Sequence, residues 1–175
     1  FNFISVVIAT AINDWGIYIP HNPCKMMKRE TEAKPRKRIL ENDEQTRLIE
    51  SCALSDNIYL MPMVQFSIET SVRQGELLKI KYEHINFKKR LVTLYDTKNG
   101  EDRIIPLSQK AFSILCSLPR QFNGRMFPMT RHSLKFWWRQ ALKRAKIEGL
   151  RWHDLRRHAI TIMFEEKGLD VPTVQ

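Results

Sequence analysis

Cysteine is scarce in this sequence, and its scarcity excludes the small folds that depend on cross-links. Three cysteines occur in 175 residues, at Cys24, Cys52 and Cys116. Because their number is odd and their spacing is wide, they form neither a disulfide framework nor the paired pattern of a zinc site. A chain of this length buries enough surface to fold without such links. We therefore expect reduced thiols and a cytoplasmic protein.

Long hydrophobic runs are missing as well. Residues 1–13 form the longest uncharged run at the amino end, and this run is too short to cross a bilayer. It also lacks the basic flank and the cleavage site of a signal peptide. We therefore expect no membrane partner. The sequence starts at Phe1 rather than at a methionine, so we also expect it to be part of a longer protein.

Acidic residues are outnumbered by basic ones. The sequence has 19 Asp and Glu against 29 Lys and Arg, a formal net charge of +10. Such an excess favours a nucleic-acid partner ahead of acidic proteins and membrane surfaces. A basic surface without any such partner is the alternative. The charged residues are interleaved with aromatic and β-branched residues, which argues against disorder.

The segment between residues 17 and 38 combines prolines with a dense run of basic residues. This composition breaks regular structure and predicts a linker. We expect three parts: the last helix of one domain at 1–20, a basic linker at 21–38 and a second domain at 39–175. The linker is either a solvated tether or a strap along a phosphate backbone. Its candidate DNA-binding residues are Lys34, Arg36, Lys37 and Arg38.

The second domain is predicted to be α+β, mainly helical with a small three-stranded antiparallel sheet. Alternating apolar residues indicate short strands at 85–87, 91–95 and 104–106. The Asn99-Gly100 pair between the last two strands is the strongest hairpin signal, since both turn residues need positive φ.

Helical spacing of apolar residues recurs along the rest of the sequence. Ser71 and Gln74 have the spacing of a capping box, which predicts a helix from there to about Ile80. Gly16 and Gly168 are expected to end the first and last helices. The predicted helices lie at 1–16, 41–53, 59–69, 71–80, 108–118, 130–146 and 154–167.

The predicted helix at 130–146 has two distinct faces. Its apolar face (Leu134, Trp138, Ala141, Leu142, Ala145) is expected to join the core. Its basic face has no acidic residue to neutralise it, so it is either a solvated surface or a contact to a DNA groove or backbone. The candidate DNA-binding residues on this face are Lys135, Arg139, Lys143 and Lys146.

Four residues stand out as candidates for chemistry on an anion. Arg73 falls at the start of a predicted helix, where free N–H groups favour negative charge. Lys98 lies at the edge of the predicted hairpin, and His153 and Arg156 are three residues apart on one helical face. Each also has an ordinary explanation, as a surface cation, turn residue, cap or ion-pair partner. If they converge, the four would form a phosphate site.

Together these residues stand in sequence motifs that resemble the tyrosine recombinase (phage integrase) family over essentially the whole chain. All four motifs occur in the family's order and at compatible spacing. The end of the preceding domain, with Asp14-Trp15-Gly16 and Asn22-Pro23, resembles that family's core-binding domain and linker. The motifs are Glu69-Thr-Ser-Val-Arg73-Gln-Gly-Glu76-Leu-Leu, Asp96-Thr-Lys98-Asn-Gly100 with Arg103-Ile-Ile-Pro106-Leu, Met126-Phe-Pro128 and His153-Asp-Leu-Arg156.

The resemblance implies a DNA breaking-rejoining catalytic fold and a reaction. A tyrosine attacks a phosphate of duplex DNA, forms a 3′-phosphotyrosyl bond, and the strand is rejoined to a new partner without metal or other cofactor. Arg73 and Arg156 would hold the phosphate, Lys98 would protonate the leaving 5′ oxygen, and His153 would assist proton transfer. Glu76 would orient Arg73. The implied assembly is a tetramer on DNA for the full-length protein, and we expect a monomer for this chain.

Two departures from the family pattern change the expectation. Ser71 stands where the family has glycine, which we interpret as tolerable because serine caps helices well. The sequence ends at Gln175, before the family's Gly-His segment and tyrosine nucleophile, so we expect it to bind DNA without cutting it. The alternatives are a non-catalytic DNA-binding remnant or regulator, a type IB topoisomerase relative and, least favoured, a metal phosphohydrolase using His153, Asp154 and His158.

Overall fold

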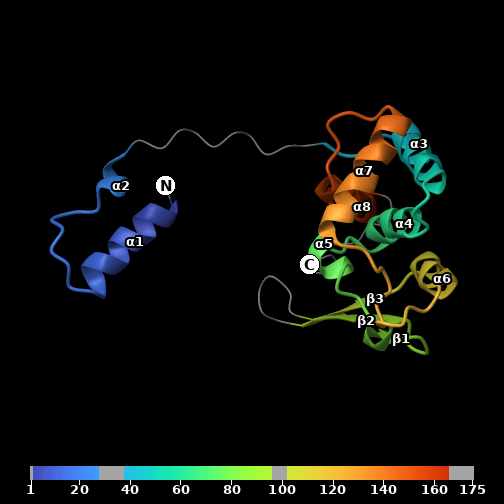
Figure 1. Cartoon of the computed structure of the whole chain (residues 1–175), viewed down its shortest axis with the longest axis horizontal. Helices are drawn as coiled ribbons and strands as arrows, with labels where there is room; N and C mark the ends of the chain where they lie inside the picture. Colours follow the sequence, from blue (N-terminus) through green and yellow to red (C-terminus); the bar gives the residue numbers. More distant parts are fainter. Residues whose placement is uncertain (1, 28–37, 96–101, 166–175) are drawn as a thin grey trace. The chain divides into compact units, whose positions relative to one another are not determined.

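The computed structural model describes residues 2–27, 38–95 and 102–165. The chain divides into two compact units, residues 1–36 and 37–175, which are described separately (Figure 1). Among the described residues, no helix has both the length and the apolar character needed to cross a bilayer.

The first unit consists of helix α1 (Asn2–Asn13) and the short helix α2 (Pro23–Met26). The predicted first helix is confirmed, and the chain turns at Gly16 with φ of 64°. Buried Asn22 joins the two helices: its Nδ2 donates to the Ser5 carbonyl at 2.8 Å, and its Oδ1 accepts from the Cys24 N–H at 3.0 Å. The α2 helix lies inside the segment that we expected to be irregular, because Asn22 caps it and proline suits its first position.

The second unit is built around one central helix, α4 (Leu60–Thr70), which packs against α3, α6 and α8 (Figure 1). Six side chains of α4 are buried, and Phe66 lies 5.8 Å from Phe127 between ring centroids. Pro62 is accommodated because it falls in the first turn of α4. The other helices are α3 (Asn42–Ala53), α5 (Gln74–Leu77), α6 (Gln109–Ser117), α7 (Arg131–Ala145) and α8 (Trp152–Glu165), with a 3₁₀ turn at Tyr82–His84.

The three strands form one antiparallel sheet in the order β1-β2-β3, at one edge of the helical layer (Figure 1). Their bounds are β1 (Ile85–Asn86), β2 (Leu91–Leu94) and β3 (Arg103–Pro106). Val92 of the central strand pairs with Ile85 on one side and Ile105 on the other. The predicted fold class is confirmed, and the predicted Asn99-Gly100 turn lies outside the described residues.

The predicted helix over 71–80 is wrong. Helix α4 continues to Thr70, Ser71 adopts a left-handed conformation with φ of 51°, and α5 is a single turn from Gln74 to Leu77. Serine at 71 therefore ends one helix rather than capping the next. The positive φ also gives a physical reason for the family's glycine at this place, since glycine adopts it without strain.

The packing around Phe127 predicts a large and specific loss of stability. Phe127→Ala is expected to lower the free energy of unfolding by about 3–5 kcal/mol, because a fully buried ring leaves a cavity beside Phe66. Urea denaturation followed by circular dichroism measures the change. Phe122→Ala, which removes a fully exposed ring, is the matched control and should shift stability by less than about 0.5 kcal/mol. Equal effects at the two positions would contradict this packing.

Candidate active site

The short helix α5 is organised by the buried carboxylate of Glu76. Glu76 Oε2 accepts the backbone N–H of Arg73 at 3.1 Å, and its Oε1 accepts Arg73 Nη1 at 2.9 Å. Arg103, at the start of β3, donates its Nη2 to Glu76 Oε2 at 2.8 Å. One carboxylate therefore fixes the main chain and the guanidinium of Arg73 and ties both to the sheet.

Arg73 and Arg103 keep the carboxylate of Glu76 ionised although it is buried. Burial alone would raise the pKa of Glu76, but the hydrogen bonds from Arg73 and the charge and hydrogen bond of Arg103 outweigh it, so this pKa lies below its usual value. The carboxylate is thus negative at neutral pH. It offsets part of the positive charge that the surrounding guanidinium groups bring.

Helix α8 contributes His153 and Arg156 from one of its faces. The helix begins at Trp152, and Asp154 accepts the Arg151 backbone N–H at 2.8 Å, which satisfies one of the free donors of its first turn. Arg156 extends from α8 and donates its Nη1 to the Ser71 carbonyl. The left-handed turn at Ser71 thus helps to hold the second arginine opposite the first.

Arg73, His153 and Arg156 line one pocket of about 110 Å³. Three of the four residues that we expected to converge are therefore brought together from α5 and α8, and Lys98 lies outside the described residues. The remaining lining residues are Ser67, Val72, Gln74 and Trp152.

Burial, together with the neighbouring positive charges, lowers the pKa values of Arg156 and His153 in this pocket. Burial and the neighbouring charges of Arg73 and Arg103 lower the pKa of Arg156, which stays charged at neutral pH as arginine does in proteins. Partial desolvation, followed by the charges of Arg157 and Arg156, lowers the pKa of His153. A neutral imidazole beside two guanidinium groups suits a tetrahedral oxyanion, since all three side chains can donate to its oxygens.

The candidate DNA-binding residues of α7 lie on the surface as predicted from its periodicity. Lys135, Arg139 and Lys143 are exposed along the helix, and Lys146 is exposed at its carboxyl-terminal cap. The opposite face is core: Leu134, Trp138, Ala141 and Ala145 are buried, and Leu142 is half-buried.

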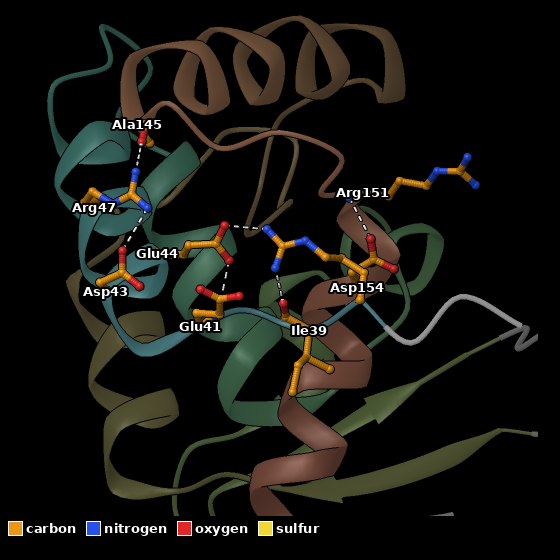
Figure 2. Close-up of polar contacts among 9 residues, drawn as sticks. Ile39, Glu41, Asp43, Glu44, Arg47, Ala145, Arg151 and Asp154 are labelled. Atoms are coloured by element: carbon orange, nitrogen blue, oxygen red, sulfur yellow. Dashed lines mark hydrogen bonds and ion pairs between the residues drawn. The ribbon is translucent and has the colours of Figure 1, made fainter.

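Arg38 is the one candidate linker residue that the structure describes, and it is engaged within the second unit. Its guanidinium forms an ion pair with Glu44 and donates to the Ile39 carbonyl. Figure 2 shows these two contacts as dashed lines that end on Glu44, in the first turn of α3, and on the Ile39 carbonyl before the helix. Lys34, Arg36 and Lys37 lie outside the described residues.

The residues of the metal-site alternative have other partners. Asp154 accepts from the Arg151 N–H and pairs with Arg157 at 3.6 Å, and His158 Nε2 lies 2.7 Å from Gln45 Oε1. Across residues 2–27, 38–95 and 102–165, no three His, Cys, Asp or Glu side chains gather as a metal ligand set. The described part of the chain therefore offers no support for that alternative.

Two features of the site were missed by sequence reasoning. Arg103 was noted only as part of a motif, yet it binds Glu76 from 27 residues away along the chain. The Ser71 carbonyl, which accepts from Arg156, could not be identified as a site group without the left-handed backbone at that residue. The sequence marked Arg103 only as a basic residue at the start of a predicted strand, which does not indicate its partner.

Comparison with known proteins identifies the family of this chain. The model of the phage integrase family matches residues 38–175. The chain belongs to the phage integrase family. Among curated relatives, it is 35% identical over 158 residues to a shufflon-specific DNA recombinase of Escherichia coli, covering 90% of this chain and 41% of the relative. It is 22% identical over 193 residues to the integrase of Salmonella phage P22, covering 99% of this chain and 48% of the relative.

Solved structures of phage integrases share the fold. A DNA-bound structure of lambda integrase residues 75–356 aligns with a TM-score of 0.75 and 18% identity, over 99% of this chain and 66% of that one. The catalytic domain of bacteriophage HP1 integrase aligns with a TM-score of 0.61 and 24% identity, over 78% of this chain and 76% of that one. The chain spans about half the length of the curated integrase relatives it matches.

The Glu76 cluster predicts a pH-dependent contribution to stability. Because the folded-state pKa of Glu76 lies below its usual value of 4.5, ionised Glu76 stabilises the fold above that pH, and the contribution is lost as pH falls through the lowered pKa. Glu76→Gln is expected to reduce the free energy of unfolding by about 1–3 kcal/mol at pH 7. The difference from the unmodified chain should narrow steadily below about pH 5.

Urea denaturation at a series of pH values measures this difference. Glu83→Gln is the matched control, because Glu83 is exposed and pairs with Lys81 at the surface. It should change stability by less than about 1 kcal/mol at any pH. A Glu76→Gln effect that stays constant between about pH 7 and pH 3 would show that ionisation of Glu76 is not what holds the two arginines.

Proposed function

We propose that this chain carries the phosphate-binding site of a site-specific DNA recombinase that cuts and rejoins duplex DNA through a 3′-phosphotyrosyl intermediate. The observation that carries the proposal is the single pocket lined by Arg73, His153 and Arg156. The pocket brings together distant motifs of a family whose relatives are named recombinases and integrases.

The two arginines act on the phosphate undergoing transfer. In the first step a tyrosine oxygen bonds to phosphorus and the bond to the 5′ oxygen breaks, so negative charge gathers on the non-bridging oxygens. Arg73 and Arg156 stabilise this charge most where it is largest, in the transition state. Glu76, which Arg103 also binds, holds Arg73 in place before the substrate arrives, so little reorganisation is needed.

Proton transfer falls to the other two candidates. Lys98 supplies a proton to the departing 5′ oxygen, which leaves a free hydroxyl on that strand. In general, a lysine does this best near neutral pH when neighbouring cations lower its pKa. His153, whose pKa is lowered, is neutral and can accept the proton that the tyrosine oxygen loses, while its N–H donates beside the phosphate.

The substrate is duplex DNA, and the α7 cations and the linker bind its backbone. Lys135, Arg139, Lys143 and Lys146 form the exposed part of this surface. Lambda integrase has been solved as a dimer bound to a core site and as a tetramer bound to a Holliday junction, which favours a DNA-bound oligomer for the full-length protein. The free thiols of the described cysteines and the DNA substrate favour the cytoplasm.

Relaxation of a supercoiled plasmid tests the proposal without a known target site. A strand that is cut and held covalently can rotate before it is rejoined, so the full-length gene product should relax the plasmid in EDTA without nucleotide. Arg73→Ala and Arg156→Ala should each lower the relaxation rate by about 100–1,000-fold, since each removes one transition-state donor. Lys89→Ala, at an exposed turn between β1 and β2, should leave the rate unchanged.

The covalent intermediate provides the second measurement. Denaturing gels of the reaction should contain protein joined to the 3′ end of a DNA strand, and the two arginine variants should form it correspondingly slowly. Binding to DNA with neither relaxation nor an adduct would favour the non-catalytic binder. Unchanged cleavage after either arginine replacement would refute the roles given to Arg73 and Arg156.

A further inference from the structure

Arg38, the last residue of the expected linker, is bound within the second unit by two polar contacts. Its guanidinium forms an ion pair with Glu44 in the first turn of α3 and donates to the Ile39 carbonyl. The side chain of Arg38 is 24% exposed and that of Glu44 is 11% exposed, so the pair is largely shielded from water. Leu40 is buried in the core. An ion pair and an apolar anchor therefore fix the end of the linker to the second unit.

The carboxylate of Glu44 depends on this partner. The hydrogen bond from Arg38 lowers the pKa of Glu44 below its usual value, against the opposing effect of burial. Glu44 Oε2 also accepts the Glu41 N–H at 3.1 Å, which satisfies a free donor at the start of α3. A shielded carboxylate that loses its guanidinium partner keeps an uncompensated charge. Loss of Arg38 would therefore disturb the first turn of α3.

The first turn of α3 is joined to α8 in two ways. Gln45, the neighbour of Glu44, places its Oε1 2.7 Å from Nε2 of the buried His158 on α8. The hydrogen bond to Glu44 raises the pKa of Arg38 most, and the charge of Asp154 in the first turn of α8 adds to it (Figure 2). Arg38 and the start of α3 are thus coupled to the helix that carries two residues of the phosphate pocket.

We propose that Arg38 is a positioning residue for the reaction: it holds the first turn of α3, and α3 in turn holds the helix that carries His153 and Arg156. The inference rests on the proposed function and gives Arg38 a role different from the DNA contact expected of the linker cations. An arginine already neutralised by a shielded carboxylate has little counterion to release to a phosphate. Its effect on orientation can be large, since a misplacement of about 1 Å slows a reaction about 100-fold.

Plasmid relaxation by the full-length gene product at saturating DNA tests the positioning role. Arg38→Gln should lower the rate by about 10–100-fold and leave the affinity for duplex unchanged, because orientation is lost and no DNA contact is. Glu44→Gln should act similarly. The double variant should be no slower than the slower single variant, since both replacements break one ion pair. Arg38→Lys keeps a charge beside Glu44 and should recover much of the rate.

Arg47→Gln is the matched control for general loss of stability. Arg47 also lies on α3 and is bound by a carboxylate and a carbonyl, those of Asp43 at 2.9 Å and Ala145 at 2.6 Å. These contacts lead to the end of α7 rather than to α8. Arg47→Gln should therefore leave the relaxation rate unchanged at a temperature where circular dichroism shows every variant to be folded.

Gln45→Ala tests the contact to α8 and leaves the Arg38–Glu44 ion pair intact, so it serves even if Arg38→Gln does not fold. It should slow relaxation, and combining it with Arg38→Gln should slow relaxation little further, because both act through the same turn of α3. Multiplied effects would show that the two residues act independently and would contradict this route to α8.

Salt dependence of binding separates positioning from a phosphate contact. A fluorescein-labelled duplex of arbitrary sequence, titrated with the chain between about 50 and 200 mM KCl, gives the slope of log K against log salt. Arg38→Gln should leave this slope unchanged. If Arg38 contacted a phosphate, the replacement would instead reduce the slope by about 0.9.

The outcomes distinguish this inference from the proposed function. An unchanged relaxation rate in Arg38→Gln, or the reduced salt slope of a phosphate contact, would overturn the positioning role. Equal losses of rate in Arg38→Gln and Arg47→Gln would overturn it too, because general destabilisation would then explain both. Each of these results leaves the recombinase proposal standing. A full-length protein that neither relaxes the plasmid nor forms the adduct would overturn both, since no reaction would remain for Arg38 to support.

Discussion

The buried carboxylate of Glu76 is the group on which the pocket lined by Arg73, His153 and Arg156 depends. Arg73, Arg103 and Arg156 bring three positive charges close enough that each of the first two lowers the pKa of the third. Removing the Glu76 carboxylate would leave the charges of these arginines uncompensated. The loss of folding free energy would be far larger than the contribution of a surface ion pair. Glu76 therefore makes it possible for a small domain to keep several arginines together without an anion bound between them.

The backbone around Ser71 makes a second, independent contribution. The left-handed residue ends α4, the most buried helix of the unit, and turns the chain so that Arg73 starts α5. The same turn presents the Ser71 carbonyl to Arg156 on α8. The core thus determines where both arginines lie, because α4 packs directly against α8.

The sequence predicted those parts of the fold whose signals are local. The bounds of helix α7 were predicted closely, because Thr130 caps the helix and its apolar residues follow helical spacing as far as Ala145. The shared helical face of His153 and Arg156 was predicted from their separation of three residues. The helix over 71–80 was predicted wrongly because the Ser71-Gln74 pattern competed with the real cap, in which Glu76 binds the N–H of Arg73. Arg103 escaped prediction because no local pattern reports a contact made across 27 residues.

Cations in this unit are held in two different ways, and the difference matches two physical tasks. Transition-state stabilisation rewards groups that are already oriented, so Arg73 is fixed by a buried carboxylate at the cost of part of its charge. Lys135, Arg139 and Lys143 are instead exposed along α7, a helix that contains no acidic residue. Exposed cations of this kind are the ones whose counterions a polyanion displaces on binding. The acidic residues are therefore informative by their positions: Glu76 binds Arg73 at the edge of the pocket, and no acidic residue occurs in α7.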